Sequence, residues 1–253
     1  KFNSNTIEWI CTIFMILGSL PFVIYLRFLH GEVKNVIKDD QIKLFFGILI
    51  ILIFFMTAWL ILISNQSFNN SFRESAFNIV SILTGTGYSS TNFNLWGSFG
   101  LIVLFIIMFI GGCAGSTTGG IKIFRIQLLF NAGKNQIKKL LHPHGVFVAT
   151  FNEKTVKEDT FNSVMGFFFL YIVLFSIVAA FLGFLGIDFL TSISASASAI
   201  SNVGPGLGEI IGPSGNYSQL PMLAKWILSF TMIIGRLEIF TFLVLFSSNF
   251  WKV

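Results

Sequence analysis

The chain has 253 residues, of which 54% are hydrophobic and only 11% are charged, and its mean hydropathy is +0.82. About a quarter of the residues of a soluble domain are charged, so this composition excludes an ordinary soluble domain and indicates an integral α-helical membrane protein. The net charge of +5 is small and dispersed, which argues against a nucleic-acid partner. Cys11 and Cys113 lie inside apolar segments and are interpreted as buried small residues rather than as a disulfide or metal pair.

The first half of the chain contains two full-length apolar runs. Residues 7–29 and residues 44–63 each approach the ~20 residues that a helix needs to cross the hydrocarbon core. The amphipathic stretch at 72–83 has about a dozen residues, so it can enter the membrane but not cross it. It leads into "TGTGY" (84–88), where two glycines interrupt any helix. The next apolar run, residues 99–110, is too short to span and stops at a pair of glycines.

The second half of the chain repeats this order of segments. Residues 161–185 form a third full-length span, residues 188–200 form a second half-length stretch, and "SNVGPGLG" (201–208) follows it. The last apolar run, residues 223–250, is long enough to span but carries Arg236 in its middle. The repeated order predicts an all-α membrane protein with parallel units of span, re-entrant helix, glycine-rich loop and second span.

Lysine and arginine are concentrated after the span at 7–29 and after the apolar run at 99–110. The connections at 64–71 and 208–220 contain neither residue type. The positive-inside rule therefore places the basic segments in the cytoplasm and these two connections outside, so both half-length helices re-enter from the outer face. The basic residues are Arg27, Lys34, Lys38, Lys43, Lys122, Arg125, Lys134, Lys138, Lys139, Lys154 and Lys157.

The two glycine-rich loops are predicted to line an ion path. An unpaired amide in hydrocarbon costs several kcal/mol, so non-helical backbone at membrane depth must face water or an ion. Glycines permit dihedral angles that turn successive carbonyl oxygens toward one axis, where they replace the hydration shell of a cation. The C-terminal end of each re-entrant helix adds negative potential there. A mere connector is the alternative for one loop, but two loops at equivalent places favour a selectivity filter.

The segment "GGCAGSTTGG" (111–120) interrupts a membrane helix with five glycines in ten residues. A phosphate-binding loop does not fit, because Ile121 separates the glycines from Lys122 and no strand precedes them. The alternatives are a simple kink and a loop that faces a cavity, and the second is favoured because broken helices line transport pathways. Arg236 lies within an apolar run, where a charge costs roughly 2.5–3.5 kcal/mol, so we expect it to face the pore or a partner.

Four motifs occur in a specific order: "TGTGY" (84–88), "GGCAGSTTGGIKIFR" (111–125), "SNVGPGLG" (201–208) and "GRLEIFT" (235–241). Together they resemble the C-terminal half of a TrkH-type potassium uptake protein, of the Trk/Ktr/HKT superfamily. Members of this family carry four repeats of helix, pore helix and helix (M1, pore helix, M2), as potassium channels do. The resemblance implies that this chain holds two of the four, with the boundaries 1–30 (last M2 helix of repeat 2), 31–43 (cytoplasmic loop), 44–135 (repeat 3, with a broken M2), 136–160 (cytoplasmic loop) and 161–253 (repeat 4).

The resemblance also implies roles for single residues. The potassium filter would comprise Thr84, Gly85, Thr86, Gly87, Ser201, Asn202, Val203 and Gly204. Potassium would bind the carbonyls of Gly85, Thr86, Asn202 and Val203, joined by those of the filter glycines Gly87 and Gly204. A gate below the filter would comprise an obstructing loop and an arginine that repels cations: Gly111, Gly112, Gly115, Ser116, Thr117, Thr118, Gly119, Gly120 and Arg236. The absence of a second glycine after Tyr88 and the presence of Pro205 imply weaker discrimination of potassium from sodium.

The function implied is passive potassium uptake by a multi-pass protein of the bacterial cytoplasmic (inner) membrane, with no enzymatic reaction and no covalent cofactor. A symporter that couples potassium to protons or sodium is the alternative. It would need an ionisable residue near the ion path, for which Asp188, Glu209, Arg236 and Glu238 are candidates. The expected partners are membrane lipid, a cytoplasmic nucleotide-binding TrkA-type subunit and a second full-length copy. Because the first two filters are absent, we expect a piece of a longer protein.

Overall fold

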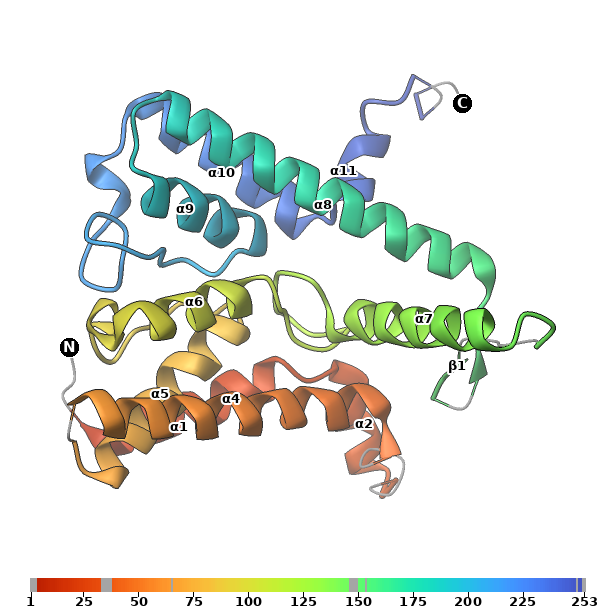
Figure 1. The fold of residues 1–253 in the computed structure, drawn as a ribbon, viewed down its shortest axis with the longest axis horizontal. Coiled ribbons are helices and arrows are strands. Elements are labelled where there is room, and N and C mark those ends of the chain that lie inside the picture. Colours follow the sequence, from red (N-terminus) through yellow and green to blue (C-terminus); the bar gives the residue numbers. More distant parts are fainter. Residues whose placement is uncertain are drawn as a thin grey trace.

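The computed structural model describes residues 4–32, 38–64, 66–145, 150–152, 154–248 and 250–251. These residues form a helical protein in which α6 and α7 lie between a group containing α1, α4 and α5 and a group containing α8, α9 and α10 (Figure 1). The described helices are α1 (Asn5–Gly18), α2 (Phe22–Leu29), α4 (Asp40–Ser64), α5 (Phe68–Leu83), α6 (Gly97–Met108), α7 (Ile123–Leu141), α8 (Glu158–Phe184), α9 (Phe189–Ser201), α10 (Met222–Arg236) and α11 (Ile239–Val244). Short 3-10 turns at Phe93–Trp96 and Tyr217–Gln219 complete the helical elements.

Two of the described helices are long and apolar enough to cross a membrane: α4, with 25 residues, and α8, with 27. Only 22% of the 18-residue apolar window of each helix is buried inside the protein. Most of that apolar surface therefore faces outward, where lipid can cover it. The spans predicted at 44–63 and 161–185 are confirmed.

The prediction of one continuous helix over residues 7–29 is wrong, because the chain breaks there into α1 and α2 with a bend of 93°. The break falls at Pro21, which has no N–H to continue a helix and which disfavours helical geometry in the residue before it. The carbonyl oxygens of Gly18 and Ser19 are thereby freed from helical pairing. They accept hydrogen bonds from residues 113–117 instead.

The run predicted at 223–250 is also interrupted and forms two helices, α10 and α11, rather than one continuous helix. α10 ends at Arg236, which places this arginine at a helix end rather than in the middle of a span. Glu238, two residues later, has a φ of 60°, in the left-handed region that a glutamate rarely adopts. This turn directs the Glu238 carboxylate to Arg125 on α7, at 2.7 Å.

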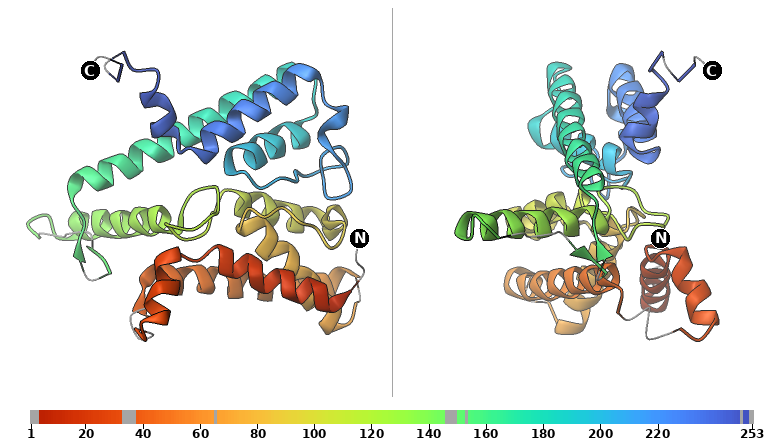
Figure 2. Two further views of the ribbon diagram at one scale, coloured as in Figure 1. Left: turned by 180° about the vertical axis from the view of Figure 1, so that it is seen from behind. Right: turned by 90° about the vertical axis from the view of Figure 1, so that its right-hand side faces the viewer.

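The two half-length helices are confirmed as α5 and α9, with 16 and 13 residues. Every residue of α5 from Ser75 to Leu83 is buried, as is every residue of α9 from Ser194 to Ser201. α5 packs on α4 and α1, and α9 packs on α8 and α10, as the view from behind in Figure 2 also shows. The C-terminal ends of both short helices are therefore enclosed by protein.

The last part of each unit differs between the two halves. α6 has 12 residues, in agreement with the short run predicted at 99–110, and irregular chain separates it from α7. In the second half, α10 has 15 residues and ends at Arg236, shortly before α11 begins. Between α7 and α8, β1 (Thr150–Phe151) and β2 (Lys154–Thr155) form a small antiparallel hairpin.

Gly235 allows α10 to approach the end of α9, and this contact yields a stability prediction. A Cβ at Gly235 would lie 2.0 Å from the carbonyl oxygen of Ile200, whereas a Cβ at Gly183 on α8 meets no atom within 4 Å. We expect Gly235→Ala to lower the free energy of unfolding by about 1–3 kcal/mol, as overpacking does. Gly183→Ala is the matched control and should leave it unchanged or slightly higher. Thermal unfolding of the detergent-purified protein measures both, and equal stabilities would contradict the close approach.

Candidate functional site

The chain leaves α5 and α9 along the same backbone path. After α5, the N–H groups of Thr86 and of the glycine that follows both donate to the carbonyl oxygen of Ser81, at 3.0 and 3.3 Å. After α9, the N–H of Val203 donates to the carbonyl oxygen of Ser198 at 3.0 Å, and the N–H of the following glycine donates to the Ser198 hydroxyl at 3.0 Å. Both loops thus turn their N–H groups back onto the helix that they leave.

Left-handed dihedral angles recur at equivalent positions of the two loops. Gly85 and Gly87 have φ values of 67° and 76°, and Asn202 and Gly204 have φ values of 56° and 116°. Glycine adopts such angles at no steric cost, and asparagine is one of the few other residues that tolerates them. The fourth predicted filter segment therefore follows the path of the third, with an asparagine where the third has a glycine.

The carbonyl oxygens of the two loops are mostly without hydrogen-bond donors, unlike their N–H groups. Those that accept no hydrogen bond from any described residue belong to Gly85, Thr86, Gly87, Asn202 and Val203. Gly204 differs, because the Tyr217 hydroxyl donates to its carbonyl oxygen at 2.8 Å. Such a set of unpaired carbonyl dipoles suits a dehydrated cation.

The two loops lie against each other. A Cβ on Gly87 would be 2.1 Å from the carbonyl oxygen of Val203, and the nearest atom to a Cβ on Gly204 is the Cα of Gly87, at 3.7 Å. Any side chain at Gly87 would therefore displace the neighbouring loop. The sequence-predicted filter glycines are brought together at this contact.

Thr84 and Ser201 were also predicted as filter residues. They lie at the C-terminal ends of α5 and α9, and both are buried. The hydroxyl of Thr84 lies 2.8 Å from that of Thr86. The hydroxyl of Ser201 lies 2.6 Å from that of Tyr171 on α8. The protein itself engages both side chains, so these two residues support the loops rather than offering free hydroxyls.

The predicted gate segment is a closed loop between α6 and α7. Its ends meet in a parallel bridge between Ile110 and Ile121. The N–H of Gly111 donates to the carbonyl of Ile121 at 2.9 Å, and the N–H of Ile121 donates to the carbonyl of Phe109 at 2.9 Å. Gly120, with a φ of 66°, lets the chain return to its starting point. The geometry is that of a loop rather than of a simple kink.

Gly119 places this loop directly against both glycine-rich loops. A Cβ on Gly119 would lie 2.1 Å from the carbonyl oxygen of Ser201 and 3.1 Å from the Cβ of Asn202. The backbone nitrogen of Gly119 is 3.6 Å from the position that a Cβ on Gly85 would take. The predicted gate and the two predicted filter segments therefore form one contiguous site.

Hydroxyl groups and one lysine hold the loop from within. The hydroxyl of Thr118 accepts from the N–H of Gly112 at 3.0 Å and lies 2.9 Å from the hydroxyl of Ser116. Ser116 also donates to the carbonyl of Cys113 at 2.6 Å. The Nζ of Lys122 donates to the Thr118 hydroxyl at 3.0 Å and to the Thr118 carbonyl oxygen.

The break between α1 and α2 supplies further partners to the loop, because the carbonyl and N–H groups there are not paired within a helix. Four hydrogen bonds connect the two segments. The N–H of Cys113 donates to the carbonyl of Ser19 at 3.0 Å, and the hydroxyl and the N–H of Thr117 both donate to the carbonyl of Gly18, at 3.0 and 3.4 Å. The N–H of Phe22 donates to the carbonyl of Gly115 at 3.0 Å.

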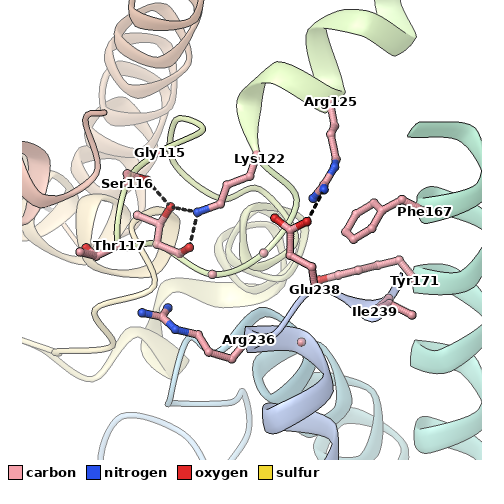
Figure 3. A pocket seen from close by; sticks show the side chains of 14 residues that line it. Gly115, Ser116, Thr117, Lys122, Arg125, Phe167, Tyr171, Arg236, Glu238 and Ile239 are labelled. Carbon is pink, nitrogen blue, oxygen red and sulfur yellow. Dashed lines mark hydrogen bonds and ion pairs between the residues drawn. The ribbon is translucent and has the colours of Figure 1, made fainter. Parts of the chain in front are cut away.

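A cavity of about 260 Å³ separates the loop from α8 and from the break between α10 and α11 (Figure 3). Lys122, Arg125, Arg236 and Glu238 bring four charges to its wall. Arg125 pairs with Glu238 at 2.7 Å, and its guanidinium carbon lies 3.9 Å from the centre of the Phe167 ring. Since one carboxylate faces three cationic groups, the wall carries net positive charge.

Arg236 is exposed and, within the described part of the chain, makes no ion pair and no side-chain hydrogen bond. Figure 3 shows its guanidinium extending away from Glu238, toward the loop that carries Thr117. A cation on this side of the two glycine-rich loops would meet an uncompensated positive charge, which opposes its passage.

Sequence reasoning placed two residues of this site elsewhere and left a third without its partner. Lys122 and Arg125 were counted among the cytoplasmic basic residues, yet both line the cavity. Glu238 was left without a partner, because its ion-pair partner lies 113 residues away. The sequence did carry a signal for Lys122 and Arg125, because both lie within five residues of the glycine-rich segment that forms the loop.

Comparisons with known proteins identify a family. A family model described as TrkH, cation transport protein, matches residues 1–253. The chain is 41% identical over 244 residues to the Trk system potassium uptake protein TrkI of Halomonas elongata, covering 96% of this chain and 49% of the relative. It is 32% identical over 255 residues to the Trk system potassium uptake protein TrkH of Escherichia coli, covering 99% of this chain and 52% of the relative.

A solved structure shows the same fold. The crystal structure of the potassium transporter TrkH from Vibrio parahaemolyticus matches with a TM-score of 0.91 and 34% identity, over 99% of this chain and 54% of that chain. The chain thus spans about half the length of the relatives that it matches. The expected helical, multi-pass membrane fold is confirmed, and the chain belongs to the TrkH family of cation transport proteins.

Proposed function

We propose that this chain forms two of the four units of a potassium uptake pore in the bacterial cytoplasmic membrane. The observation that carries this proposal is the pair of adjacent loops after α5 and α9, whose N–H groups are engaged while five carbonyl oxygens accept no hydrogen bond from the described residues. Carbonyl oxygens replace the hydration shell of a cation, and the C-terminal ends of the two short helices add negative potential. The relatives' names as potassium uptake proteins supply the ion.

The assignment of repeats is part of the proposal. α4, α5 and α6 with α7 form the third unit, and α8, α9 and α10 with α11 form the fourth. The broken pair α1 and α2 then closes the second unit, whose filter, like that of the first, lies outside this chain. The shared backbone path of the two loops supports the equivalence of the two units.

The loop at 111–120 and Arg236 form the proposed gate. The loop contacts both filter segments through Gly119, and many hydrogen bonds to α1, α2 and its own side chains hold it there. Arg236 adds an unpaired positive charge on the same side. Conduction then requires the loop and this charge to move out of the ion path.

The carboxylates support a passive pore over a symporter. Asp188 accepts from the N–H of Thr191 at 3.0 Å as the N-cap of α9, and the hydroxyl and N–H of Thr191 hold the pKa of Asp188 below its usual value. Glu238 is paired with Arg125. Two of the four candidates, Asp188 and Glu238, are therefore engaged in structural contacts.

The proposed partners follow from charge and from the family. α7 extends beyond the loop and ends with Lys134, Lys138 and Lys139 exposed, which suits anionic lipid or a cytoplasmic TrkA-type subunit. We also propose that full-length chains pair as a homodimer.

Growth rescue tests the proposed function directly. In an uptake-deficient bacterium at low potassium, the chain joined to the N-terminal half of a TrkH relative should restore growth, and the chain alone should not. The reason is that two of four carbonyl-bearing loops leave half of the coordination shell open. Rescue by the chain alone would overturn the two-of-four assignment. No rescue by the joined protein, when it is present in the membrane, would overturn potassium uptake.

Filter glycines should control selectivity. In the joined protein, Gly87→Ser and Gly204→Ser should each reduce the preference for potassium over sodium on the order of tenfold, because both residues hold a positive φ and Gly87 has no room for a Cβ. Flux in liposomes under defined gradients measures this preference. Gly183→Ser, at an open position on α8, is the control. Equal effects at all three positions would reject the filter assignment.

Arg236 should limit flux. Arg236→Gln removes the unpaired charge and should raise potassium flux through the joined protein by about tenfold, equivalent to a barrier lowered by ~1.4 kcal/mol. The same change at Arg27, an exposed residue of α2 outside the cavity wall, should have no effect. Unchanged flux in Arg236→Gln, at matched protein levels, would remove this residue from the gate.

A further inference from the structure

The β1–β2 hairpin, which connects the two repeats, is attached to the first turn of α4. The N–H of Asp40 donates to Oδ1 of Asn152 at 2.9 Å, and the N–H of Asn152 donates to Oδ2 of Asp40 at 3.2 Å. The Nδ2 of Asn152 donates to Oδ2 of Asp39 at 3.3 Å. Asn152 has a φ of 46°, an angle that asparagine tolerates, so its position at the hairpin turn lets backbone and side chain bind α4 together.

The same turn of α4 holds the proposed gate loop. Gln41 is buried, with 8% of its surface exposed, and its Oε1 accepts from the N–H of Ala114 at 2.9 Å. The N–H of Gln41 donates to Oδ1 of Asp39 at 3.0 Å. Asp39 therefore bridges Gln41 and Asn152, and an unbroken chain of hydrogen bonds joins the hairpin to the loop.

A second contact joins the hairpin to the far end of the loop. The ring of Phe151 on β1 meets the ring of Phe124 edge-on, with centroids 4.7 Å apart. Phe124 is the second residue of α7, and α7 begins directly after the loop. The hairpin thus touches two elements that contact or adjoin the loop: α4 through Asn152 and α7 through Phe151.

We propose that Gln41 is a positioning residue that holds the gate loop against the filter, and that the β1–β2 hairpin is the cytoplasmic element through which the loop is moved. This inference rests on the proposed role of the loop as a gate. A displacement of the hairpin removes Asn152 from Asp39 and Asp40, which disturbs the first turn of α4. The N–H of Ala114 then loses its acceptor within the protein.

The thiol of Cys113 can report on the loop without any measurement of transport. Cys113 is fully buried, lies next to Ala114, and is one of two cysteines in the chain. In a Cys11→Ser background of the joined protein, the rate at which a small thiol reagent modifies Cys113 measures how often the loop leaves its site.

Gln41→Met removes the acceptor at nearly constant volume and should raise this rate about tenfold or more, as expected for the loss of a buried hydrogen bond. Gln136→Met, at an exposed position on α7, is the matched control and should leave the rate unchanged. Asn152→Asp places a third carboxylate against Asp39 and Asp40, so it should raise the rate to a similar extent.

The double variant Asn152→Asp with Asp39→Asn exchanges donor and acceptor across the same contact, and it should restore slow modification. A fast rate in Asn152→Asp that the exchange reverses supports the chain of hydrogen bonds. An unchanged rate in Gln41→Met would overturn the positioning role. An unchanged rate in Asn152→Asp, or a fast rate that the exchange leaves fast, would overturn the connection to the hairpin.

Potassium flux through the same variants separates this inference from the proposed function. Faster modification with a several-fold rise in flux supports both. Faster modification with unaltered flux keeps the connection between hairpin and loop but rejects the loop as the gate. Altered flux with unaltered modification rejects the connection while leaving the pore assignment in place.

Discussion

Backbone groups within a membrane must find partners inside the protein, because hydrocarbon offers no water to replace them, and the organisation of this chain follows from that requirement. α5 and α9 end inside the protein. N–H groups of the loop that follows each helix donate to the last turn of that helix, at Ser81 and Ser198. The donors are thereby used, and the carbonyl oxygens of the two loops are left for a ligand. The cation of the proposed filter would satisfy them without any side-chain charge. Glycine at 87 then lets the two loops approach closely enough to share it.

The same requirement explains why two spans are broken. The loop between α6 and α7 carries its own irregular backbone, and a continuous helix beside it would have no free carbonyl groups to offer. The break at Pro21 releases the carbonyls of Gly18 and Ser19, which accept hydrogen bonds from the loop. The break at Glu238 acts through charge instead, since it lets the carboxylate neutralise Arg125, while Arg236 pairs with no acidic group among the described residues. Both breaks therefore place backbone or charged groups beside the loop between α6 and α7.

Length, hydropathy and glycine positions were sufficient to predict the two long spans, the two half-length helices and the residues that meet between them. Those features follow from local composition, because the membrane thickness sets helix length and glycine sets the permitted dihedrals. The breaks within 7–29 and 223–250 do not follow from length and hydropathy; Pro21 marks the first in the sequence, and Arg236 with Glu238 marks the second. The Arg125–Glu238 pair joins residues 113 positions apart, and only the folded chain brings them together.

The two filter segments share a path but not a chemistry, and this difference bears on selectivity. Asn202 takes the left-handed position that Gly85 takes in the other loop, and its Nδ2 donates to the carbonyl of Met232 at 3.0 Å. The carbonyl of Gly204 accepts from the Tyr217 hydroxyl, whereas that of Gly87 accepts from no described residue. The fourth segment is thus fixed to α10 and to the outer connection, while the third is held mainly by its own helix. Carbonyl rings discriminate between ions through the number and field strength of their dipoles. A ring built from unequal segments offers unequal dipoles, so strict selectivity of the kind produced by four identical loops is not expected of this architecture.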